Sequence, residues 1–135
     1  MKASLRHLVR ERAGKRCEYC GLLDDAAPAA SFHVEHIYAK QHEGDDDLEN
    51  LCWSCHRCNL SKGPNLSGRD PVAGKIVLLF HPRTQLWTRH FRWDGPFLVG
   101  RTQTGRATIA VLDINHPQRV ELRQALMVAE EWPEE

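Results

Sequence analysis

The sequence lacks a net charge, a long apolar run and a leader-like N-terminus, and each absence excludes a class of protein. No stretch approaches the roughly 20 apolar residues of a membrane-spanning helix, and no basic start is followed by an apolar run of about 7 to 15 residues. We therefore expect a cytoplasmic protein with no membrane partner. Because 18 basic residues balance 18 acidic ones, the protein is not uniformly basic in the way that a non-specific nucleic-acid-binding surface would be.

The balanced total hides charge that is segregated along the chain. Basic residues gather before residue 17 and again from residue 75, whereas acidic residues dominate from 24 to 49. This pattern suits the binding of a polyanion. The basic segments would contact it on both sides, and the acidic segment between them would attract a metal ion. The alternative is that these are solvated faces with no partner.

A chain of 135 residues predicts one catalytic unit with an elaboration. We expect an α+β fold, with a module over residues 1–66, its core at 12–63, and a segment over 67–135 that packs on it. The module should contain a helix over 4–13, a strand over 31–38 and a short helix that ends near Gly63. The segment should contain strands over 76–80, 86–93, 97–102 and 108–112 in a small antiparallel sheet, then a helix capped by Asn115.

Five cysteines are present, and four of them form two Cys-x-x-Cys pairs, Cys17 with Cys20 and Cys55 with Cys58. Each pair presents two thiolates from one tight turn, and two such turns satisfy tetrahedral zinc. Four cysteine ligands leave no open position, so the predicted Zn²⁺ is structural. The alternative is four buried cysteines without metal. We expect Cys52 to be a packed core residue.

Between and after the cysteine pairs lies an ordered set of motifs. Glu-His-Ile occupies 35–37, Glu-Asn-Leu 49–51, Cys-x-x-Cys-Asn 55–59 and Lys-Gly 62–63. In this order, the segment from about residue 12 to residue 63 resembles the HNH endonuclease family, also called the His-Me finger nucleases. The resemblance implies a ββα-metal fold around a catalytic ion, and cleavage of DNA that leaves 5′-phosphate and 3′-hydroxyl ends.

The chemistry of phosphodiester hydrolysis explains these residue types, since it needs an activated water and neutralisation of charge at phosphorus. An imidazole is partly neutral near pH 7, so we assign His36 as the general base. Glu35 and Asn59 offer oxygen atoms for one hard cation, Mg²⁺ or Mn²⁺. By resemblance, Asn50 ties the following loop to the first strand and orients the base. Many family members carry Asp at the Glu35 position and His at the Asn59 position.

Contacts to nucleic acid are expected from both halves of the chain. Lys62 lies one helical turn beyond Asn59, where an ammonium could meet a phosphate. Arginine mixed with aromatic residues in the second half suits phosphate contact or stacking on unpaired bases, although Trp87, Phe91 and Trp93 also follow the alternation of a buried strand face. The candidate contact residues are Arg57, Lys62, Arg83, Arg92 and Arg106.

The sequence thus predicts an HNH endonuclease that acts on DNA, expected to be double-stranded, as a monomer or a homodimer. Two competing hypotheses belong to other classes. The first is a zinc-dependent nucleic-acid-binding module without catalysis, and the second is a protein-interaction module that uses the acidic loop over residues 43–49.

Overall fold

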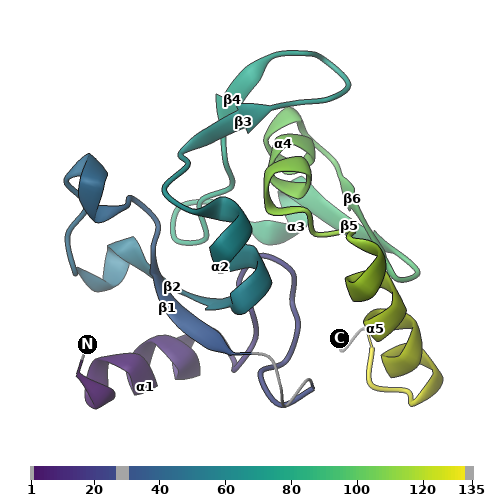
Figure 1. Ribbon diagram of the computed structural model, residues 1–135, viewed down its shortest axis with the longest axis horizontal. Helices are drawn as coiled ribbons and strands as arrows, with labels where there is room; N and C mark the ends of the chain where they lie inside the picture. The colour runs from purple at the N-terminus through teal and green to yellow at the C-terminus, as the bar shows by residue number, and fades with distance from the viewer. Residues whose placement is uncertain (1, 27–30, 133–135) are drawn as a thin grey trace.

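The computed structural model describes residues 2–26 and 31–132, and it is a mixed α+β structure, as predicted (Figure 1). The helices are α1 (Ala3–Arg12), α2 (His56–Lys62), α3 (Trp87–His90), α4 (Gln103–Leu112) and α5 (Pro117–Val128), with short 3-10 turns η1 (Lys40–His42) and η2 (Leu48–Asn50). The strands are β1 (Phe32–His36), β2 (Leu51–Cys55), β3 (Ser67–Arg69), β4 (Ile76–Leu78), β5 (Phe91–Asp94) and β6 (Phe97–Gly100).

The first half is an antiparallel hairpin followed directly by a helix. In the β1–β2 register, Phe32 lies opposite Cys55 and Glu35 lies opposite Cys52. Cys55 ends β2 and also caps α2, because its sulfur accepts a hydrogen bond from the Cys58 backbone N–H. Gly63 ends α2 at a φ of +52°, a conformation that glycine adopts without the steric penalty of a side chain. The helix therefore ends where the sequence predicts.

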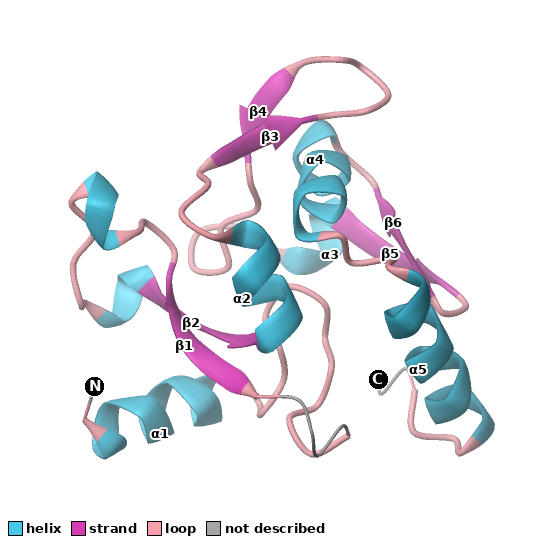
Figure 2. Ribbon diagram, viewed as in Figure 1, coloured by secondary structure: helices cyan, strands magenta, loops and turns pink. Residues whose placement is uncertain are grey.

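The second half departs from the predicted sheet. Its strands form two separate hairpins, β3–β4 and β5–β6 (Figure 2). The strand predicted over 108–112 is wrong, because these residues belong to α4, and the strand predicted over 86–93 begins instead with the helical turn α3. Local capping outweighs the β propensity of this stretch, since Thr102 accepts a hydrogen bond from the Gly105 backbone N–H.

The predicted cap of the last helix is also wrong by one residue. His116 caps α5, because its side chain accepts a hydrogen bond from the Gln118 backbone N–H. Asn115 instead bonds the β6 backbone, accepting from Leu98 N at 2.9 Å and donating to Leu98 O at 2.8 Å. The amide thus joins the β5–β6 hairpin to the start of α5.

A single cluster of buried side chains runs through both halves of the chain. Tyr19, near the first cysteine pair, meets Phe80 edge to face, and Phe80 meets Phe91 in the same way. Figure 1 shows α2 at the centre, with the β1–β2 hairpin on one side and α4 on the other. The position of α2 therefore depends on both halves.

None of the helices in the described ranges is long and apolar enough to cross a membrane.

A buried ion pair fixes the β3–β4 hairpin to α4. Asp70 has no exposed surface and accepts two hydrogen bonds from Arg106, at 2.9 and 2.7 Å. The Arg106 guanidinium holds the pKa of the Asp70 carboxyl well below its usual range. Because the pKa is lower in the folded state than in the unfolded state, the stabilisation is present above about pH 4 and fades as the pH falls through the folded-state pKa.

We predict that Asp70→Asn lowers the melting temperature by several degrees, because it leaves the Arg106 charge without its buried partner. Thermal unfolding followed by circular dichroism should give the same decrease in melting temperature at about pH 6 and at about pH 8, since the carboxyl is ionised at both pH values. Asp113→Asn is the matched control, because that carboxylate pairs with Arg57 and is 55 % exposed. Equal losses in the two variants would contradict the prediction.

Candidate active site and metal cluster

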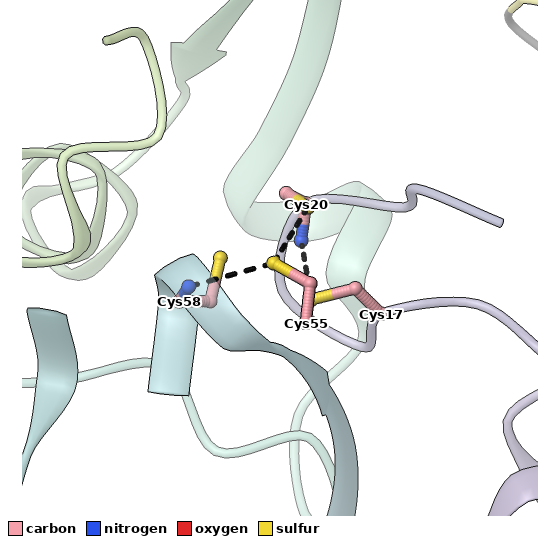
Figure 3. Close-up of side chains that lie close together, drawn as sticks. All are labelled: Cys17, Cys20, Cys55 and Cys58. Atoms are coloured by element: carbon pink, nitrogen blue, oxygen red, sulfur yellow. Dashed lines mark hydrogen bonds between the residues drawn. The ribbon is translucent and has the colours of Figure 1, made fainter. Parts of the chain in front are cut away.

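The four predicted cysteines come together in one buried cluster (Figure 3). Their sulfur atoms all lie within 4.8 Å of one another, and Cys20 Sγ lies 3.8 Å from Cys55 Sγ. Four sulfurs at the corners of a tetrahedron around zinc, with bonds of about 2.3 Å, are separated by about 3.8 Å. The cluster therefore has the shape of a closed tetrahedral zinc site.

The chemistry of the cluster also favours a cation. Hydrogen bonds from Cys17, Cys20 and Cys58 lower the pKa of Cys55, while the corresponding contacts raise the pKa of Cys58. Four buried sulfurs this close cannot all be thiolates on their own, and a bound cation would hold all four of them as thiolates. Cys52 is fully buried but lies outside the four-sulfur cluster.

Asn50 joins the loop after β1 to the end of that strand. Its side-chain oxygen accepts from the Tyr38 backbone N–H at 2.8 Å, and its amide nitrogen donates to Tyr38 O at 3.1 Å and to Asp45 O at 2.8 Å. The residue is buried. The loop over residues 39–49 is thus closed by one amide side chain beside His36.

His36 is the last residue of β1, and its side chain meets the loop. His36 Nε2 lies 2.6 Å from Asp46 Oδ1. Asp46 also lies 3.7 Å from Lys40 Nζ, and the hydrogen bond from His36 together with Lys40 lowers the pKa of Asp46. Asp46 is therefore an ionised acceptor for the His36 ring.

Glu35 points into the interior. Its side chain is 5 % exposed, and Oε2 accepts a hydrogen bond from the Cys52 thiol at 3.2 Å. Lys62 Nζ lies 3.4 Å from Oε1 and donates to Ile37 O at 3.1 Å. Burial raises the pKa of Glu35, and the Lys62 ammonium offsets part of that rise. The predicted phosphate contact Lys62 is thus placed as the ion partner of the predicted metal ligand.

The donor set fits a hard divalent ion. Glu35 Oε1 is buried and lies 3.4 Å from the Lys62 ammonium, but it accepts no hydrogen bond of good geometry from the described residues, so it keeps lone pairs for a ligand. Asn59, on α2 one turn before Lys62, makes no side-chain hydrogen bond within those same ranges. Lys62 spans from α2 to Glu35, so the face of α2 that carries Asn59 lies toward β1.

The predicted arginine contacts lie in different surroundings. Arg57 pairs with Asp113 at 2.9 Å, Arg106 with Asp70 at 2.7 Å, and Arg83 with Glu18. Arg92 lies exposed on β5. The structure therefore gives three of these arginines internal partners and leaves the Arg92 guanidinium at the surface.

Sequence reasoning missed two features of the site. Asp46 stands among three consecutive aspartates, and nothing in that run distinguishes the one that meets His36. The Tyr19 hydroxyl lies 3.7 Å from Cys52 Sγ. The sequence gives no sign of this contact, because Tyr19 stands between Cys17 and Cys20 and suggests only a residue of the metal-binding turn. Both contacts join residues that the fold, not the local spacing, brings together.

We predict that stripping the four-sulfur cluster of its metal unfolds the first half of the protein. The purified chain should contain about one zinc per molecule, and a strong chelator should remove the part of the helical circular dichroism that comes from α1 and α2, because such sites contribute roughly 10 to 16 kcal/mol to folding. Cys58→Ser should lose both the zinc and the fold, whereas Cys52→Ser should keep its zinc. A spectrum unchanged after complete zinc removal would refute the structural role.

The comparisons with known proteins agree with this arrangement. A family model described as HNH endonuclease matches residues 17–65, the stretch that holds both cysteine pairs, β1, β2 and α2. A curated relative, the Septu protein PtuB of Bacillus thuringiensis, is 26 % identical over 122 residues, which cover 88 % of this chain and 44 % of the relative. The chain thus spans less than half the length of that protein. No solved structure matches the chain. Residues 17–65 are therefore a domain of the HNH endonuclease family.

Proposed function

We propose that this protein is an endonuclease that hydrolyses phosphodiester bonds in DNA, with His36 as general base and one divalent ion held by Glu35 and Asn59. The observation that carries the proposal is the pairing at the end of β1, where a histidine held by an ionised aspartate adjoins a buried carboxylate that has one oxygen free of hydrogen bonds. A histidine with a charged orienting partner is a common arrangement for proton transfer.

The contact with Asp46 determines which ring nitrogen takes the proton. An ionised carboxylate only accepts hydrogen bonds, so His36 Nε2 carries the proton that faces Asp46. In the neutral ring, Nδ1 is then the basic nitrogen that removes a proton from water. Asp46 also stabilises the imidazolium that forms, as a positioning residue that touches no substrate. Asn50 acts in the same indirect way, since it fixes the loop that carries Asp46.

The proposed metal site at Glu35 depends on a carboxylate that is held in one position. Mg²⁺ or Mn²⁺ bound between Glu35 and Asn59 would neutralise the charge that develops on the phosphate and on the leaving oxygen. Lys62, Cys52 and Tyr19 hold the Glu35 side chain in place and limit its exposure to bulk water. A longer side chain than aspartate suits this site, because the carboxylate must reach past the strand to α2.

The proposed substrate is DNA with a phosphodiester in reach of β1 and the loop behind it. Arg92 is the proposed phosphate contact with the most accessible guanidinium. Arg57, Arg83 and Arg106 are weaker candidates, because each is neutralised by a carboxylate of the same chain. A single metal ion supports cleavage of one strand at a time, so nicked circular plasmid should appear before linear product.

A nucleic-acid-binding module without catalysis is the competing function, and it predicts binding without nicking.

We expect His36→Ala to reduce nicking of supercoiled plasmid in Mg²⁺ or Mn²⁺ by about 100-fold or more, because it removes the general base. The assay follows conversion of supercoiled to open circular DNA over time. His42→Ala is the matched control, since that histidine lies exposed in the same loop. Nicking that survives the His36 substitution would remove this residue from the mechanism.

Asp46→Asn should lower kcat about tenfold and leave KM nearly unchanged, because the amide still meets the ring but no longer stabilises its charged form. Asp25→Asn, at an exposed carboxylate before β1, is the control. Single-turnover cleavage rates at saturating DNA measure the effect. A variant in which only KM rises would mean that Asp46 contacts the substrate and does not position His36.

A further inference from the structure

A cavity of the described chain lies away from the proposed catalytic residues, beside the first cysteine pair. Its volume is about 370 Å³, within the range of roughly 300 to 1,000 Å³ in which proteins hold small organic ligands. Three of the four tryptophans in the sequence line it: Trp87, Trp93 and Trp132. Such walls favour a flat, aromatic guest.

One wall of this cavity carries a polar group that has no internal partner. Trp132 is 7 % exposed, and its indole N–H meets no acceptor in the part of the chain that the structure describes. Two other indoles have acceptors, since the partly buried Trp87 donates to Tyr19 O at 2.9 Å and the buried Trp53 donates to Asp24 at 3.2 Å. A buried donor without an acceptor is costly. The guest that suits this cavity therefore brings a hydrogen-bond acceptor.

The tryptophan-lined cavity has a neighbour that lies closer to the proposed active site. A second cavity, of about 160 Å³, shares Phe80 and Gln85 with it. This second cavity is lined by Ile37, the neighbour of His36, and by Lys62, the ion partner of Glu35. No carboxylate lines the second cavity among the described residues. The second cavity therefore borders both the tryptophan-lined cavity and residues next to the proposed active site.

We propose that the tryptophan-lined cavity seats a nucleobase from an unpaired strand of the substrate, at a distance from the point of cleavage. A nucleobase has a flat π face for the indole rings, and ring nitrogen and carbonyl acceptors for Trp132. The inference rests on the proposed function in one respect, that the ligand is nucleic acid. It adds that the substrate has unpaired nucleotides, as in a flap, gap or bulge, that reach this cavity while another part of the DNA lies at the catalytic residues.

Binding tests the proposal without any cutting. Zinc-loaded protein without added Mg²⁺ or Mn²⁺ is titrated with a short single-stranded oligodeoxynucleotide, and tryptophan fluorescence is followed. Stacking on the cavity walls should quench the emission. Trp132→Phe keeps an aromatic ring, although a smaller one, and deletes the donor, so its affinity should fall about two- to tenfold. Trp53→Phe, the same change outside the cavity, should bind like the wild type.

A second pair of variants leaves the cavity walls intact. Leu86 lines the cavity and Leu60 does not, yet both side chains are 70 % exposed. Leu86→Glu places a negative charge at the cavity, so it should weaken binding of the strand about tenfold, whereas Leu60→Glu should not. Both proteins should fold, because neither leucine is part of the core.

Three outcomes would overturn the proposal. These are equal affinities for Leu86→Glu and Leu60→Glu, binding of the oligodeoxynucleotide without fluorescence quenching, and quenching by an aromatic peptide but not by the strand, which would assign the cavity to a protein partner. Nicking of plasmid is measured separately. Loss of plasmid nicking with retained strand binding would count against the proposed catalysis and leave this inference standing.

Discussion

The four-sulfur cluster is the constraint on which the first half of the structure depends. Cys17 and Cys20 lie between α1 and β1, whereas Cys55 and Cys58 lie where β2 turns into α2, so a metal at the cluster joins segments that are far apart in sequence. A binding energy of roughly 10 to 16 kcal/mol exceeds that of any single packing contact. Because α2 follows Cys55 directly, the cluster also sets how closely α2 approaches β1. That approach is what lets Lys62 reach Glu35.

Consecutive side chains of a strand point to opposite faces, so the last two residues of β1 lie in different chemical environments. Glu35 faces inward, where a thiol, a tyrosine hydroxyl and an ammonium surround it, and His36 faces the loop that Asn50 closes. The inner group is suited to hold a cation and the outer group to exchange protons with water. Glu35 and His36 are consecutive residues of β1, so their side chains leave the strand on opposite faces. The proposed mechanism requires the ion and the imidazole to reach one phosphate around the end of this strand.

The sequence predicts what depends on spacing and fails where distant residues meet. The cysteine cluster and the end of α2 at Gly63 follow from residues a few positions apart, and both predictions are confirmed. The strand predicted over 108–112 is wrong because Thr108 and Ile109 have β propensity, while the Thr102 cap and the bond from the Thr108 hydroxyl to Thr104 O favour a helix. The contact between His36 and Asp46 depends on how the loop folds back, and no local pattern encodes that path.

The central claim is that Glu35 and Asn59 hold a divalent ion beside His36, and metal binding tests it most directly. Electron paramagnetic resonance of zinc-loaded protein titrated with Mn²⁺ should reveal one bound ion per chain. Glu35→Gln and Asn59→Ala, checked for retained zinc, should each lose that ion, whereas Glu49→Gln, at an exposed carboxylate of η2, should keep it. Unchanged Mn²⁺ binding in the Glu35 and Asn59 variants would contradict the account.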